Sequence, residues 1–106
     1  MVADKLIEDF SQQIVERFGA QQVILFGSYP NGTPTVDSDV DLLVVMPFTG
    51  RSVDESVKIR MALRPAFPVD LLIRTSEKIQ ERIQQGDTFL SDIMEYGKVL
   101  YAADHV

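Results

Sequence analysis

The sequence predicts an α/β (α+β) fold in which helices pack against a small mixed β-sheet. Three observations support this fold class. Some segments repeat apolar residues at helical spacing, short β-rich apolar runs lie between them, and glycines and prolines cluster at the boundaries. The chain has 106 residues, 45% hydrophobic and 25% charged, which is an ordinary globular balance. We therefore expect a single domain over residues 1–106, with elements in the order α-β-β-α-β-α-α and a possible last strand.

The first third of the chain predicts a helix, a strand and a long loop. Apolar residues recur at every fourth position over Asp4–Phe18, which predicts an amphipathic helix that Gly19 ends. Residues 23–26 form a short apolar run bounded by glycine, which is typical of a buried strand. Residues 27–39 are dense in Gly, Pro, Ser, Thr, Asn and Asp, so we expect a loop there.

The middle of the chain predicts two strands joined by a helix. Residues 40–46 are apolar on both faces of the expected strand and are followed by Pro47. A helical pattern covers residues 53–63 and carries Arg60, and two prolines follow it. Residues 69–73 then predict the third strand.

The last third of the chain predicts two short helices and an edge strand. The helices are expected over residues 77–85 and 87–96, with a glycine between them. Asp87 suits the N-cap of the second helix, and Gly97 suits its C-cap. Residues 99–101 are expected to add a strand at the edge of the sheet.

Composition excludes several classes of chemistry. There are 16 acidic and 10 basic residues, and the net charge of −6 argues against a protein that holds nucleic acid mainly through phosphate contacts. The absence of cysteine excludes disulfides, thiol nucleophiles and Cys-ligated zinc. His105 is the only histidine, which excludes a Ser-His-Asp triad and a multi-His metal site. With no apolar run of membrane-spanning length and no visible signal peptide, we expect a cytoplasmic protein.

Three aspartates stand at the starts of two expected strands. Asp39 and Asp41 are two residues apart at the start of the second strand, so their side chains share one face. Asp70 lies at the start of the third strand, between two apolar residues. Unpaired buried charge is costly, so these carboxylates need a neutralising partner. If the two strands are neighbours, the three carboxylates converge and suit Mg²⁺, with two ions expected for a phosphoryl displacement.

A glycine and a serine follow the first expected strand. Gly27 lets another group approach the backbone closely, and Ser28 offers a hydroxyl and an N–H. Both features suit a phosphate. The sequence thus predicts a nucleotide phosphate chain held between this turn and the aspartates.

The spacing Gly27-Ser28, ten residues, Asp39-Val40-Asp41 resembles the signature of the nucleotidyltransferase superfamily typified by DNA polymerase beta. The chain is most similar to the minimal nucleotidyltransferases, the MNT half of HEPN/MNT toxin–antitoxin pairs. This resemblance implies a polymerase beta-like nucleotidyltransferase fold. It implies that Asp39 and Asp41 bind Mg²⁺, and that Asp70 is the third catalytic carboxylate and a metal ligand. Gly27 and Ser28 would contact the phosphates of ATP.

The resemblance also implies an activity and a partner. The chain would be a Mg²⁺-dependent protein adenylyltransferase and antitoxin that transfers AMP from ATP to a tyrosine of a HEPN ribonuclease toxin encoded nearby. One alternative is an antitoxin that neutralises the toxin by binding alone. In close family members Arg or Lys often precedes the loop glycine, where this chain has Asn31, and this departure favours that alternative. Another is transfer to a different acceptor, such as nucleic acid.

Two simpler explanations of the aspartates fit less well. Three alternating aspartates ending at Asp41 open an EF-hand pattern, but Leu42 stands where the loop needs glycine and Phe48 where it needs glutamate. A solvated turn explains Asp37. It does not explain Asp41 and Asp70, which lie inside apolar runs.

Overall fold

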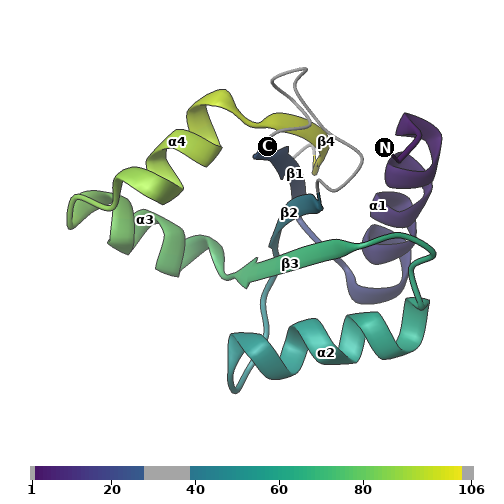
Figure 1. Cartoon of the computed structure of the whole chain (residues 1–106). Helices are drawn as coiled ribbons and strands as arrows, with labels where there is room; N and C mark the ends of the chain where they lie inside the picture. Colours follow the sequence, from purple (N-terminus) through teal and green to yellow (C-terminus); the bar gives the residue numbers. More distant parts are fainter. Residues whose placement is uncertain (1, 28–38, 104–106) are drawn as a thin grey trace.

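The structure is a computed structural model that describes residues 2–27 and 39–103. Its helices and strands follow one another in the order expected from the sequence (Figure 1). Their bounds are α1 Asp4–Phe18, β1 Gln22–Phe26, β2 Val40–Val45, α2 Ser52–Leu63, β3 Val69–Arg74, α3 Ser76–Gln84, α4 Thr88–Tyr96 and β4 Lys98–Ala102. Within these described residues, the structure contains no helix with the length and apolarity needed to cross a membrane.

The ends of the elements agree with the sequence to within one residue, and the caps explain why. Gly19 has a φ of +71° and donates its N–H to Val15 O, which ends α1 as expected. The Asp87 side chain accepts the N–H of Leu90 at the start of α4, as an N-cap does. Gly97 ends α4 with an extended backbone, not the left-handed one common at helix ends. Close packing against Ile24, and not the backbone conformation, requires glycine at position 97.

The sheet is mixed, with the strand order β3-β2-β1-β4. β1 pairs antiparallel with β2, the next strand in the chain, and also with β4, the last strand. β2 and β3 run parallel and therefore need a long crossover, which contains α2. The expected α/β (α+β) class with a small mixed sheet is confirmed, and β4 lies at one edge of the sheet, as expected.

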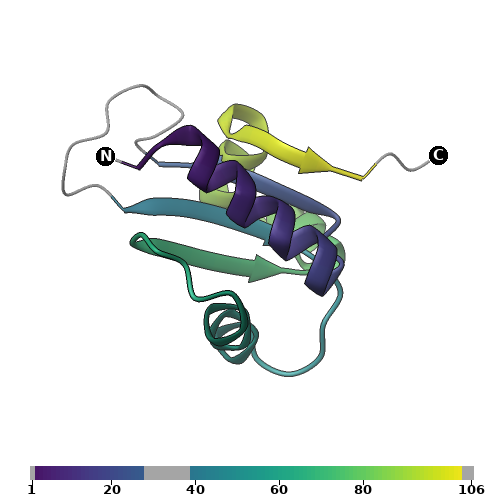
Figure 2. The ribbon, with the colours of Figure 1, turned by 90° about the vertical axis from the view of Figure 1, so that its right-hand side faces the viewer.

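Helices cover both faces of the sheet. Figure 2 shows α1 crossing one face, with α3 and α4 behind the sheet. Val40, Leu42 and Val44 of β2 join one core with α1 and α2, and Leu43 and Val45 join the other with α3 and α4. β2 is therefore buried on both faces, as its unbroken apolar run predicted. The second face is the one on which the aspartates lie.

We predict that Gly97→Ala destabilises the protein through steric conflict alone. A Cβ at this position would lie 2.5 Å from Ile24 Cγ2 and 2.6 Å from Ile93 O. Overpacking of this kind costs about 1–3 kcal/mol of unfolding free energy, measurable by urea denaturation. Lys98→Ala changes the next, exposed residue and should leave the unfolding midpoint nearly unchanged. Equal midpoints for the two variants would contradict the close packing of α4 on β1.

Candidate active site

The parallel pairing of β2 with β3 brings two aspartates together. Asp41 is the second residue of β2, Asp70 is the second residue of β3, and the two are direct register partners. Asp39 precedes β2 by one residue and is exposed. Its charge acts on Asp41, as does that of Asp70. The expected neighbourhood of the two strands is therefore confirmed, and the three aspartates lie at one end of the sheet.

Asp41 is the electrostatically strained member of the group. Burial raises its pKa above the ordinary value of 3.8, and the charges of Asp70 and Asp39 raise it further. A hydrogen bond from the protonated Asp41 carboxyl to Asp70 acts in the same direction. A cation at this point would relieve all of these costs at once.

Gly27 lies directly against Asp41. It has a φ of +84°, and a Cβ added there would lie 3.3 Å from Asp41 Cγ and collide with Asp41 Oδ2. From the sequence, we expected Gly27 to let a phosphate approach the backbone. In the structure, its missing side chain makes room for the aspartate itself, and the backbone conformation also favours glycine. Ser28, the other expected phosphate contact, lies outside the described residues.

Arg60 of α2 contacts the start of β3, beside Asp70. Its Nη2 donates to Val69 O and lies 3.9 Å from Asp70 Oδ1, while the Asp70 side chain remains 70% exposed. The sequence placed Arg60 on a helix with Lys58 and Arg64, where these side chains fitted either the steering of a triphosphate or a solvated helix face, and it did not predict the contact with Asp70. The contact could have been inferred from the short connection between α2 and β3. This connection turns the chain back and places residue 60 beside residue 70.

The donor set suits a hard divalent cation such as Mg²⁺. Asp39 and Asp41 supply carboxylate oxygens, and the raised pKa of Asp41 reflects the negative charge that a cation would neutralise. Among the residues that the structure describes, however, no group of three acidic or histidine side chains is arranged to hold a metal ion. Asp70 faces Arg60 as well as Asp41. The chemistry of Asp39 and Asp41 suits a cation, and their role as its ligands stays a prediction.

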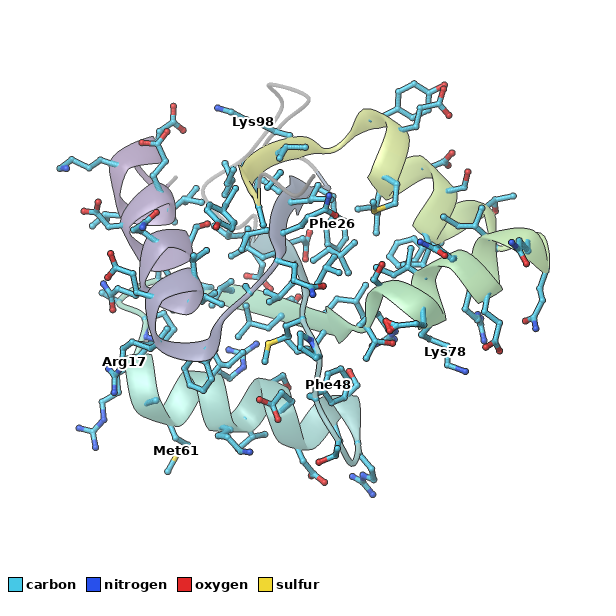
Figure 3. All side chains as sticks on the ribbon, turned by 180° about the vertical axis from the view of Figure 1, so that it is seen from behind. Arg17, Phe26, Phe48, Met61, Lys78 and Lys98 are labelled. Carbon is cyan, nitrogen blue, oxygen red and sulfur yellow. The ribbon has the colours of Figure 1, made fainter. Side chains whose placement is uncertain are left out.

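One cavity lies at the end of the sheet that carries the aspartates, and another lies at the opposite end. A cavity of about 380 Å³ is lined by Phe26, which pairs with Asp41 across β1 and β2, and by Gly27. Figure 3 shows Phe26 at the end of β1, on the side that faces α4. A larger cavity of about 740 Å³ lies at the other end of β3, next to Arg74, and none of the three aspartates is among its described lining residues. Of these two cavities, the smaller borders the candidate site through Gly27.

Most of the chain matches a nucleotidyltransferase family model and a curated relative. The family model described as nucleotidyltransferase domain matches residues 7–100. A protein of Methanocaldococcus jannaschii, provisionally named protein adenylyltransferase MJ0604, is 27% identical over 107 residues, which cover 95% of this chain and 100% of that protein.

Solved structures share the fold. A toxin–antitoxin structure with AMP-PNP has a TM-score of 0.58 at 24% identity, covering 92% of this chain and 74% of that one. A complex of tri-AMPylated Shewanella oneidensis HEPN toxin with MNT antitoxin has a TM-score of 0.54 at 21% identity, covering 95% and 74%. The nucleotidyltransferase fold expected from the sequence is thus confirmed.

We predict that Asp41→Asn raises the melting temperature of the metal-free protein by a few degrees at pH 7. The pKa of Asp41 is higher in the folded than in the unfolded state, so the folded protein binds more protons. This contribution to stability is fully present below pH 3.8 and is lost as the pH rises through the raised pKa. The advantage of the variant should therefore vanish at about pH 3.8 and below.

Differential scanning calorimetry across this pH range is the measurement. Asp9→Asn is the control, because Asp9 is exposed on α1 and pairs only weakly with Lys5, 3.7 Å away. A lower melting temperature for Asp41→Asn at pH 7 would show that this carboxylate is stabilising in the folded protein.

Proposed function

This chain belongs to the nucleotidyltransferase domain family, and we propose that it transfers AMP from ATP to a tyrosine hydroxyl of a HEPN-type toxin. The proposal makes the protein the antitoxin of a toxin–antitoxin pair. One observation carries the catalytic part: Asp41 and Asp70 are register partners on parallel strands, and Gly27 is packed against Asp41.

In this proposal, the aspartates hold the metal ion and the Gly27-Ser28 turn contacts the phosphates of ATP. Asp39 and Asp41 would hold Mg²⁺, and Asp70 would complete the carboxylate set. When bound, Mg²⁺ neutralises charge on the phosphates and on the departing pyrophosphate, and two ions are expected from the family's chemistry. Gly27 and Ser28 would contact the phosphates. The glycine turn keeps the backbone close to Asp41, so the phosphate chain and the carboxylates share one small space.

The transfer step is a displacement at the α-phosphorus of ATP. The tyrosine oxygen forms a bond to the α-phosphorus, the bond to the bridging oxygen breaks, and pyrophosphate leaves. Asp70 is 70% exposed and so within reach of a side chain presented by another protein. Its carboxylate would accept the hydroxyl proton as the new bond forms. Arg60, 3.9 Å away, would hold this carboxylate in place.

The acceptor is assigned from charge and from the relatives. A net charge of −6 suits a basic partner, because complementary charge speeds encounter and fixes orientation. RNA-cleaving proteins are basic where they hold RNA. The HEPN toxin of the Shewanella oneidensis complex is AMPylated and bound to an MNT antitoxin. With ATP as substrate and no cysteine in the chain, we place the reaction in the cytoplasm.

We predict that Gly27→Val weakens ATP binding more than Ser28→Ala does. Loss of the Ser28 hydroxyl removes one hydrogen bond to a charged group, worth about tenfold in affinity. Valine at position 27 strains the backbone and displaces the Asp41 carboxylate, so two parts of the site fail together. Isothermal titration calorimetry with Mg²⁺ measures both affinities, and circular dichroism checks folding. Wild-type affinity in a folded Gly27→Val variant would refute this arrangement.

We further predict that Asp39→Asn with Asp41→Asn abolishes both metal-dependent ATP binding and transfer. Amides supply no negative charge, so Mg²⁺ and the phosphates lose their shared anchor. Co-expression with the neighbouring toxin, followed by mass spectrometry, should show AMP on a toxin tyrosine with wild type and with the Asp9→Asn control. The double variant should show none.

Growth of the same cells separates the alternatives. A double variant that still rescues growth, together with an unmodified toxin in the wild-type culture, would identify a purely binding antitoxin. AMP found on another protein or on nucleic acid would identify a different acceptor.

A further inference from the structure

The larger cavity opens at the end of β3 that lies away from the three aspartates. Its volume of about 740 Å³ is within the range of small-molecule sites, about 300–1,000 Å³. Figure 1 shows the arrowhead of β3 between α3 and the start of α2, and residues of all three elements line the cavity. The parallel strands β2 and β3 both end here, with Val45 opposite Arg74. Ligands of open α/β sheets bind outside the carboxyl ends of the strands, so this position suits a ligand.

The lining combines basic side chains with an apolar wall. Of the described lining residues, Arg74, Lys78 and Arg82 are basic and Asp87 is acidic. The chain as a whole has 16 acidic and 10 basic residues, so this lining runs against the overall charge of the protein. Aromatic and aliphatic side chains form the apolar wall: Phe48, Val53, Leu72, Phe89 and Leu90. Such a cavity suits a molecule that joins an anionic group to an apolar body.

Arg74 is held in one position by its own hydrogen bonds. It is partly buried, and its Nη1 donates to Ser52 Oγ and to Ile73 O, in both cases at 2.7 Å. Nε and Nη2 remain available to a ligand, and no acidic side chain in the described part of the chain forms an ion pair with Arg74. A guanidinium oriented in this way favours an anion that accepts two parallel hydrogen bonds.

Lys78 supplies a second available cation. Its Nζ lies 3.5 Å from a carboxylate oxygen of Glu81, and both side chains are more than half exposed, so this pair is weak. Arg82, in contrast, is paired at 3.2 Å with Asp87, whose side chain is only 15% exposed. Arg74 and Lys78 together match a phosphate monoester, which carries a charge of about −1.5 to −2 at pH 7. A carboxylate would neutralise only one of them.

We propose that this cavity is a second ligand site, which binds a phosphate monoester with an apolar or aromatic body. Arg74 and Lys78 hold the phosphate, and the apolar wall packs against the body. The site is independent of the proposed transfer, because none of the three aspartates is among its described lining residues.

Isothermal titration calorimetry with phenyl phosphate, in the absence of Mg²⁺ and ATP, tests the site. Inorganic phosphate lacks the ring of this probe, and benzoate carries a carboxylate in place of the phosphate. We expect phenyl phosphate to bind more tightly than either. Arg74→Gln should weaken its binding about 10-fold or more, the effect of losing hydrogen bonds to a charged group, and Lys78→Gln should weaken it less. Arg17→Gln is the control, since Arg17 lies on α1, far from Lys78 in Figure 3, and it should change nothing.

Folding is checked separately, because Arg74→Gln also removes the hydrogen bonds to Ser52 and Ile73. Circular dichroism reports whether this variant folds. Lys78→Gln keeps the test decisive if it does not, since the Lys78 side chain pairs only with the exposed Glu81. Both variants should bind Mg²⁺ and ATP as the wild type does.

The contrary results are specific. An absence of phenyl phosphate binding to the wild type, or wild-type affinity in both Arg74→Gln and Lys78→Gln, would overturn the site. Equal or tighter binding of inorganic phosphate or of benzoate would overturn the ligand class. Loss of phenyl phosphate binding in Asp39→Asn with Asp41→Asn would place the phosphate at the aspartates instead. Each of these results leaves the proposed transfer intact, whereas a wild type that fails to bind ATP with Mg²⁺ would refute the transfer and leave this site standing.

Discussion

The parallel pairing of β2 with β3 is the constraint on which the site depends. Parallel strands cannot be joined by a tight turn, so the chain must leave the sheet, form α2 and return. This crossover brings Asp70 back beside Asp41 in direct register. It also sets Arg60 against the start of β3, where it bonds Val69 O and faces Asp70. The crossover that parallel pairing requires thus positions the carboxylates of Asp41 and Asp70 and the guanidinium of Arg60.

The cost of grouping carboxylates is concentrated on one residue. Asp41 is partly buried near the start of β2, on the face that packs against α3 and α4, so its charge is less well solvated than in water, and the charges of Asp70 and Asp39 add repulsion. A free energy cost of this kind is typical of functional sites, where groups are arranged for a ligand that is not part of the fold. Gly27 contributes to the same arrangement, because only a residue without a side chain leaves space for Asp41 Oδ2.

The two sides of the site have different chemistry. On the β3 side, Asp70 is exposed and paired with the guanidinium of Arg60, which suits the approach of an acceptor hydroxyl. On the β1 side, Phe26 and the face of α4 form an aromatic cavity. The strand order β3-β2-β1 places Asp41 between these sides. The carboxylates can therefore be approached from two sides that differ in chemistry.

The sequence by itself determined the elements and the chemistry-bearing residues of this protein. Helical and strand periodicities depend on local neighbours, so α1, β2 and the N-cap Asp87 were predictable, as was the unusual position of carboxylates at Asp41 and Asp70. Tertiary structure decided which residues meet. The contact of Arg60 with Asp70, the place of Gly27 against Asp41 and the cavity beneath α4 join segments far apart in the chain. Such contacts depend on strand order and register, which local patterns of side chains do not encode.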